Sequence, residues 1–142
     1  MDPRVTLITL GVRDLERARA FYRDGLGFPL SSMSDDDVAF FRTGGTVLAL
    51  WPRHLLAEDA GLSPEGSGFA GMALAHNVQE KEQVDAVLAQ AQAAGATILV
   101  PARDTFWGGY SGYFADPDGF AWEVAWGPDF TYDAAGAMIL PE

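Results

Sequence analysis

A chain of 142 residues, with 49% hydrophobic and 20% charged residues, has the size and balance of one folded domain or of two small halves that share a core. Its formal net charge of −11 argues against a nucleic-acid partner, because phosphates require a basic surface, and favours cationic ligands at long range. With no cysteine and no apolar run long enough to cross a bilayer, we expect a cytoplasmic protein with no membrane partner.

The first half of the chain predicts a strand, a helix and three further strands. Residues 5–12 are aliphatic and β-branched, which is typical of a strand. Asp14 is a suitable N-cap for the helix that follows, which ends at Gly25 and Gly27. A short strand is expected next, and then a hairpin around Gly44 and Gly45. These three strands are assigned to residues 28–32, 38–42 and 46–51.

The second half repeats this order after a segment of different composition. Residues 52–68 contain Pro52, Pro64 and several glycines, so they predict a linker with one helical turn near 55–59. A strand, a helix and three strands then follow, which makes the chain an internal repeat. The expected ranges are 71–76 for the strand, 80–94 for the helix, 97–100 for the next strand, and a hairpin that closes near residue 127.

The last hairpin carries the most informative segment of the chain. Asp116, Pro117, Asp118 and Gly119 supply the residues of a tight turn. Glu123 follows within an aromatic strand, where a carboxylate is costly to bury. We therefore expect this side chain to face solvent, a partner or a cavity.

These motifs resemble those of the vicinal oxygen chelate superfamily, which holds glyoxalases, extradiol dioxygenases and bleomycin-resistance proteins. The similarity covers about residues 4–127 and is carried by the segment from Thr9 to Tyr22, by Leu26-Gly27-Phe28 and by the Asp-Pro-Asp-Gly hairpin. It implies an α+β fold in which tandem βαβββ modules form an incomplete barrel around a cavity, and it implies a homodimer. The expected organisation is a single domain over 1–142, with module one over 4–51, the linker over 52–68, module two over 69–127 and a C-terminal arm over 128–142.

The resemblance also implies where a metal would be held. The metalloenzymes of the family place ligands on four strands, and the matching positions here are Leu7, Ala49, about Gly71, and Glu123. Of these side chains, only that of Glu123 carries a donor atom, whereas a divalent cation needs several nitrogen or oxygen ligands. The histidines, His54 and His76, lie away from these positions. We therefore expect no metal and no cofactor.

Strand alternation predicts which side chains line the cavity. We expect the second hairpin to pair Phe114 with Ala121, Gly112 with Glu123 and Tyr110 with Ala125. Tyr110 and Phe114 would then share the face of Glu123, and Trp107 would belong to a rim. The full set of expected ligand-binding residues is Leu7, Thr9, Phe40, Ala49, Trp51, Trp107, Tyr110, Phe114 and Glu123.

An aromatic lining with one carboxylate suits a small, flat aromatic ligand, and a cationic one would gain further. The leading hypothesis is a metal-independent protein that sequesters such a molecule, as the antibiotic-resistance branch of the family does, in a dimer crevice. The alternative is a lyase, isomerase or dioxygenase-type enzyme with Glu123 as acid or base, or as the sole remaining metal ligand, and with Tyr110 as a hydrogen-bond donor. A third reading also stays open, in which the aromatics only fill the core and Glu123 bonds Thr9 or Tyr110.

Overall fold

The computed structural model describes residues 7–59, 63–66, 70 and 72–139. The chain divides into two compact units, Met1–Ser67 and Gly68–Glu142. The boundary between them falls in the segment that the sequence predicts to be a linker. Of the helices in the described ranges, none has both the length and the apolar character needed to cross a membrane.

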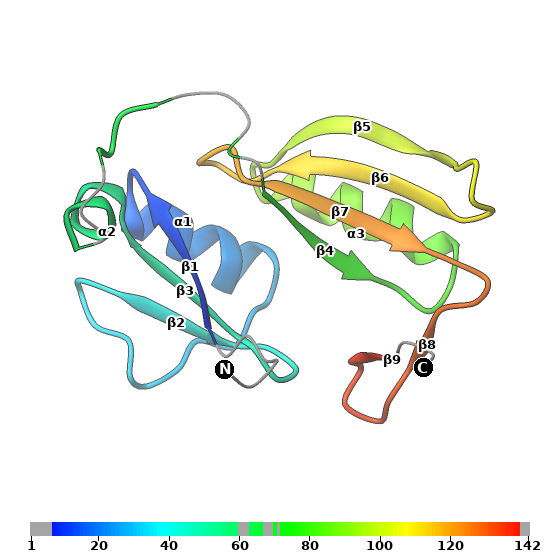
Figure 1. Ribbon diagram of the computed structural model, residues 1–142, viewed down its shortest axis with the longest axis horizontal. Helices are drawn as coiled ribbons and strands as arrows, with labels where there is room; N and C mark the ends of the chain where they lie inside the picture. The colour runs from blue at the N-terminus through cyan, green and yellow to red at the C-terminus, as the bar shows by residue number, and fades with distance from the viewer. Residues whose placement is uncertain (1–6, 60–62, 67–69, 71, 140–142) are drawn as a thin grey trace. The chain divides into compact units, whose positions relative to one another are not determined.

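Unit 1 is a mixed sheet with one long helical segment (Figure 1). Its strands β1 (Leu7–Val12), β3 (Val47–Pro52) and β2 (Ala39–Arg42) lie in the order β1-β3-β2. Strand β1 runs parallel to β3, and β2 runs antiparallel to it. Helix α1 (Leu15–Ala20) continues into a π-helical turn, η1 (Phe21–Gly25). The expected N-cap is confirmed, because a carboxylate oxygen of Asp14 accepts the Arg17 amide at 2.9 Å.

The core of unit 1 lies on one face of this sheet. Leu10, Phe41 and Leu50 are fully buried there. Tyr22, which follows α1, packs its ring against Phe41 with the centroids 5.8 Å apart. The residues that alternate with these along the strands lie on the opposite face of the sheet.

Two elements of unit 1 differ from the sequence prediction. Residues 28–32 do not form a strand but a single bridge between Leu30 and Phe41. Pro29 has no amide to donate, and its carbonyl instead accepts the Arg42 amide at 3.1 Å, so the ladder does not extend. The linker also holds more than one helical turn, because α2 spans Arg53–Asp59.

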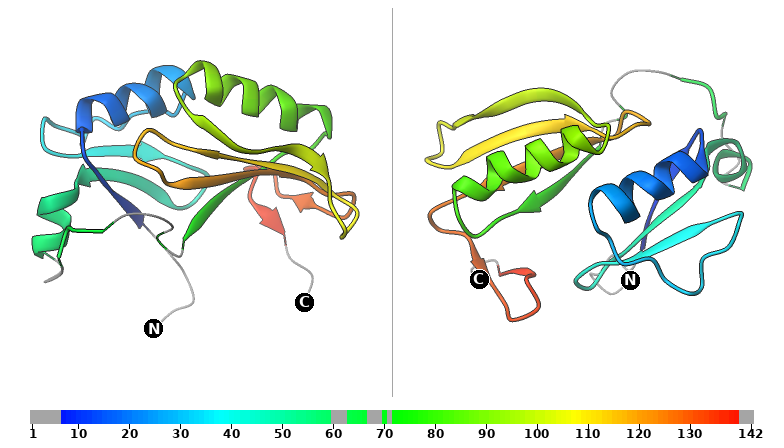
Figure 2. Two further views of the ribbon diagram at one scale, coloured as in Figure 1. Left: turned by 90° about the horizontal axis from the view of Figure 1, so that it is seen from above. Right: turned by 180° about the vertical axis from the view of Figure 1, so that it is seen from behind.

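Unit 2 repeats the strand-helix-strand-strand-strand order with a complete sheet. Its elements are β4 (Ala73–Asn77), α3 (Glu82–Ala93), β5 (Thr97–Asp104), β6 (Tyr110–Ala115) and β7 (Ala121–Trp126). The strands lie in the order β4-β7-β6-β5, with β4 parallel to β7 and the other pairs antiparallel. Helix α3 lies along one face of this sheet (Figure 2). Gly71, at the start of the expected strand over 71–76, lies outside the described residues.

The expected C-terminal arm contains a small hairpin, β8 (Thr131–Tyr132) and β9 (Met138–Ile139). The Tyr132 hydroxyl donates to the Val78 carbonyl at 3.1 Å, which holds the arm to the end of β4. Phe130, just before β8, stacks on Trp107 with ring centroids 5.8 Å apart. The arm thus packs on its own unit through at least two side chains.

The hairpin of β6 and β7 has a register one residue away from the predicted one. Phe114 pairs with Trp122 and Tyr113 pairs with Glu123. The reason is the turn: the Asp116 amide donates to the Phe120 carbonyl at 3.0 Å, which leaves a loop of three residues instead of two. Gly119, at φ +91°, takes the left-handed conformation that such a loop requires. A shift of one residue exchanges the two faces of β6.

Candidate functional site

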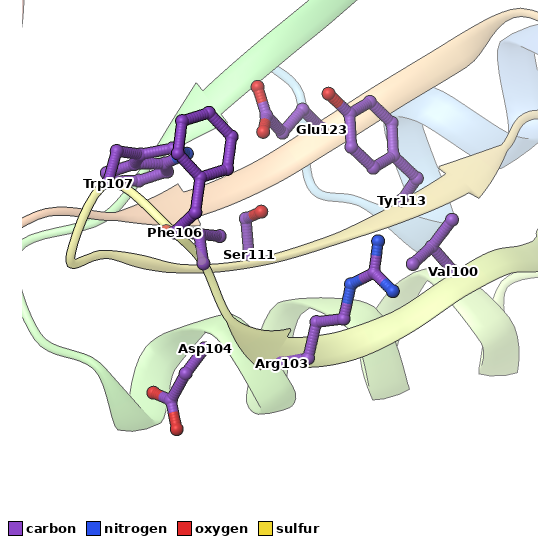
Figure 3. A pocket seen from close by; sticks show the side chains of 9 residues that line it. Val100, Arg103, Asp104, Phe106, Trp107, Ser111, Tyr113 and Glu123 are labelled. Carbon is purple, nitrogen blue, oxygen red and sulfur yellow. The ribbon is translucent and has the colours of Figure 1, made fainter.

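A pocket of about 420 Å³ lies in unit 2, on the face of its sheet away from α3 (Figure 3). Strands β5, β6 and β7 and the loop between β5 and β6 provide its walls. The lining residues are Val100, Arg103, Asp104, Thr105, Phe106, Trp107, Ser111, Tyr113 and Glu123. Two of the residues that the sequence predicts as ligand-binding, Trp107 and Glu123, are therefore in one pocket.

Glu123 and Tyr113 form the polar centre of this pocket. They occupy paired positions on β7 and β6, and their side chains rise from the same face (Figure 3). The Tyr113 hydroxyl points toward the Glu123 carboxylate (Figure 3). Burial, and after it the negative charge of Glu123, raise the pKa of Tyr113 above its ordinary value. This tyrosine therefore stays neutral and remains a donor at physiological pH.

Arg103 brings a cation to the same face through an irregularity of β5. Val100 pairs with Tyr113 and Arg103 pairs with Ser111, although two residues lie between Val100 and Arg103 while only one lies between their partners. A β-bulge therefore lies between them. It turns Arg103 to the pocket face, although strict alternation would place this side chain on the opposite face. Pro101, which cannot donate to the ladder, lies in the bulge.

Aromatic side chains gather where β5 turns into β6. The Phe106 side chain is fully exposed, and that of Trp107 is 42% exposed. Trp107 lies so close over the backbone of Gly109 that a Cβ there would collide with its ring and would come within 2.6 Å of the Trp126 carbonyl. Since Trp107 also stacks on Phe130, its ring is held in place at the pocket mouth. Phe106 has no such support.

The prediction that Tyr110 and Phe114 share the face of Glu123 is wrong. Phe114 is 2% exposed and stacks on Trp122, with ring centroids 6.1 Å apart, on the side of α3. The Tyr110 hydroxyl donates to the Asp85 carboxylate of α3 at 3.2 Å. Both are displaced by the three-residue loop, which turns Tyr113 and Ser111 toward the pocket in their place.

The remaining predicted site residues lie in unit 1. The register predicted for the first hairpin is confirmed, since Phe40 pairs with Ala49 and Arg42 pairs with Val47. Thr9 also pairs with Ala49. Thr9, Phe40 and Ala49 therefore share the face of the sheet opposite the core, and alternation places Leu7 and Trp51 on the same face. Leu7 is 43% exposed, whereas Ala49 is 1% exposed. That this face contributes to a ligand site stays a prediction.

Sequence reasoning missed several pocket residues, namely Val100, Arg103, Asp104, Thr105, Phe106, Ser111 and Tyr113. Two signals were available for some of them. Pro101 within a strand indicates a bulge, and a bulge reverses which neighbour faces the pocket. Glycine as the fourth residue of an Asp-x-x-Gly turn suits a three-residue loop, which turns Tyr113 and Ser111 inward.

The donor set at the family's metal positions does not fit a metal ion. The side chains of Leu7 and Ala49 carry no nitrogen or oxygen, Gly71 lies outside the described residues and has no side chain, and Glu123 supplies a single carboxylate. Within residues 7–59, 63–66, 70 and 72–139, no three His, Cys, Asp or Glu side chains gather in a way that could hold an ion. His76 pairs with Val124, whose side chain faces α3.

Two mixed sheets, each built from a βαβββ-type unit, define an α+β glyoxalase-like fold. The model of the Glyoxalase/Bleomycin resistance protein/Dioxygenase superfamily matches residues 4–124. The chain belongs to this superfamily, as the motifs of its sequence indicate. No curated protein matches the chain.

Solved structures support the same assignment. The chain is similar to a glyoxalase-related enzyme from Fulvimarina pelagi, with 37% identity, 99% of each chain covered and a TM-score of 0.88. It is similar to a glyoxalase/bleomycin resistance protein/dioxygenase family enzyme from Burkholderia phytofirmans PsJN, with 26% identity, 85% of this chain and 96% of that chain covered and a TM-score of 0.75. A lactoylglutathione lyase from Agrobacterium tumefaciens shares 25% identity over 89% of this chain and 96% of that chain, with a TM-score of 0.68.

Proposed function

We propose that this protein binds a small, flat aromatic molecule in the pocket of unit 2, without help from a metal. The observation that carries the proposal is the composition of one cavity of about 420 Å³, which joins exposed aromatic rings to a carboxylate. Trp107 offers a ring face that Phe130 already holds in position. Stacking on such a ring costs little conformational entropy and tolerates many ligands.

Glu123 orients the ligand in this proposal. Its carboxylate lines the pocket and has lone pairs for a donor, which a ligand N–H or ammonium group would supply. A cationic ring would gain both from this carboxylate and from the face of Trp107. The formal net charge of −11 would also raise the rate at which such a ligand arrives.

The test is isothermal titration calorimetry with aminomethylnaphthalene, a bicyclic ring that carries an ammonium group. We expect saturable binding with recovery of the unchanged ligand. Trp107→Leu should weaken it at least about fivefold, because it removes a stacking face. Leu99→Ala is the matched control, since Leu99 is 50% exposed on β5 and does not line the pocket. Equal affinity of the two variants, or no binding to the wild type, contradicts the proposal.

A second candidate function is metal-independent proton transfer, and the position of the Tyr113 hydroxyl beside the Glu123 carboxylate favours it. A carboxylate beside a neutral tyrosine could take a proton from a bound carbon acid and return it to a neighbouring carbon. The relative from Fulvimarina pelagi is described as an enzyme. The test follows hydrogen–deuterium exchange of a bound ligand by NMR. Glu123→Gln should abolish exchange while binding persists, and exchange that survives this change rejects the candidate.

A further inference from the structure

The pocket of unit 2 holds two opposite charges that do not pair with each other. Arg103 comes from β5 and Glu123 from β7, with β6 between them. Neighbouring strands lie about 4.8 Å apart, so the backbones of these two residues are separated by roughly 10 Å across the sheet. Ser111 and Tyr113, on β6, provide hydroxyl groups between the two charges.

The guanidinium of Arg103 has no ion pair or hydrogen bond within the part of the chain that the structure describes. Its acidic neighbour Asp104 is engaged by Lys81, whose Nζ lies 2.7 Å from the carboxylate. The Glu123 carboxylate lies beside the hydroxyl of Tyr113, two strands away from Arg103. In a chain with 20 acidic residues against 9 lysines and arginines, a cation on a pocket wall that no acid neutralises is available to a ligand.

The position of Arg103 depends on a specific distortion of the backbone. The bulge between Val100 and Arg103 turns this side chain from the α3 face to the pocket face. Gly112 allows β5 to approach, because a Cβ there would lie 2.9 Å from both the Val100 carbonyl oxygen and the Ala102 amide nitrogen. The chain thus brings a cation to this face through local features of two strands.

We propose that the pocket binds an amphoteric aromatic ligand, whose acidic group faces Arg103 and whose hydrogen-bond donor faces Glu123. A guanidinium binds a carboxylate with two parallel hydrogen bonds, which fixes the orientation of the ligand as well as its affinity. The ring then lies between the two charges, with Trp107 and Phe106 at the mouth of the pocket (Figure 3). This inference rests on the proposed function and adds the acidic group to the ligand.

The inference opposes what net charge alone predicts. A protein with a formal charge of −11 repels anions at long range, so a carboxylate on the ligand should weaken binding unless a local cation receives it. The effect of adding a carboxylate therefore has opposite signs with and without a role for Arg103. The test therefore asks whether the carboxylate strengthens or weakens binding, and not only by how much.

The experiment compares two probes that differ only in this charge. Both are naphthalenes with an aminomethyl group at one end, and at the other end one has a carboxylate and one has a primary amide. We expect the carboxylate to bind roughly tenfold more tightly than the amide to the wild type, since a charge-assisted hydrogen bond is the stronger kind. Arg103→Gln should remove this preference, and Arg103→Lys should retain part of it.

Controls separate this inference from the proposed function. Arg23→Gln removes one positive charge from an exposed pair with Asp24 in unit 1, and it should leave the preference unchanged. If both probes bind and Arg103→Gln behaves as the wild type, the inference fails while the proposed function stands. If neither probe binds any variant, both fail. Retention of the preference in Arg103→Gln, with circular dichroism showing a folded protein, overturns the role of Arg103.

Discussion

At the scale of single residues, the influence of Glu123 on Tyr113 can be measured through the pKa of the tyrosine. Burial, and then Glu123, raise this pKa above the ordinary value of 10.0. We predict that Glu123→Gln lowers the pKa of Tyr113 relative to the wild type, because the negative charge is lost, while burial remains. NMR titration with ring-labelled tyrosine resolves this side chain from the others. An unchanged pKa would contradict an influence of Glu123 on Tyr113.

The same pair predicts how stability depends on pH. Because the pKa of Tyr113 is higher in the folded chain than in the unfolded chain, the folded state keeps a proton that the unfolded state loses just above pH 10. Its contribution to the free energy of unfolding is complete below that pH and is lost as pH rises to the folded pKa. Tyr113→Phe should therefore reduce the fall in stability over this window, as measured by urea unfolding. The pKa values of Tyr110 and Tyr132 are also raised, so only the difference between the wild type and Tyr113→Phe is informative.

At the scale of elements, the turn that sets the register of β6 and β7 depends on one buried carboxylate. Asp116 is 4% exposed, and its Oδ1 accepts the amides of Asp118 at 3.0 Å and Phe120 at 2.9 Å. We predict that Asp116→Ala lowers the free energy of unfolding by about 1–3 kcal/mol, because two amides lose their acceptor away from water. Urea denaturation measures this loss.

The chain supplies a matched control for this turn. Asp133, in the hairpin of β8 and β9, accepts the amides of Ala135 at 2.8 Å and Ala137 at 2.9 Å in the same pattern, but it is exposed. Asp133→Ala should cost less than Asp116→Ala, since its amides can bind water instead. Equal losses in the two variants would mean that burial does not decide the cost.

Gly112 should be equally sensitive, for a steric reason. A Cβ at this position would lie 2.7 Å from Leu88 Cδ1 and 2.9 Å from two backbone atoms of β5, which cannot move without the strand. We predict that Gly112→Ala destabilises the protein by roughly 1–3 kcal/mol. Ser111→Ala, at the next position and on the other face, should cost less. A Gly112→Ala protein as stable as the wild type would contradict the packing of α3 on β6.

These elements also show which parts of the fold and of the site can be predicted from the sequence. The order of strands and helices, the N-cap at Asp14 and the register of the first hairpin follow from local signals, namely capping residues, glycines and alternation. The register of the second hairpin depends on whether its loop has two residues or three, and only the position of Gly119 in the Asp-Pro-Asp-Gly segment favours three. This difference of one residue decides whether Tyr110 or Tyr113 accompanies Glu123. The orientation of Arg103 depends on a bulge in β5, which a non-local approach of β6 permits.

At the scale of the whole molecule, native mass spectrometry tests the absence of a metal and the expected homodimer together. Three of the four positions that would ligate a metal, Leu7, Ala49 and Gly71, have no donor side chain, so we predict that the freshly purified protein carries no stoichiometric metal. The dimer expected from the family should appear at twice 15.2 kDa. Glu123→Gln is the control, since a metal that depends on the fourth position would be lost with it. A stoichiometric ion in the wild type that disappears in this variant would make Glu123 a ligand and would contradict metal-independent binding in the pocket. An organic mass retained by the wild type and lost in Trp107→Leu would support metal-independent binding.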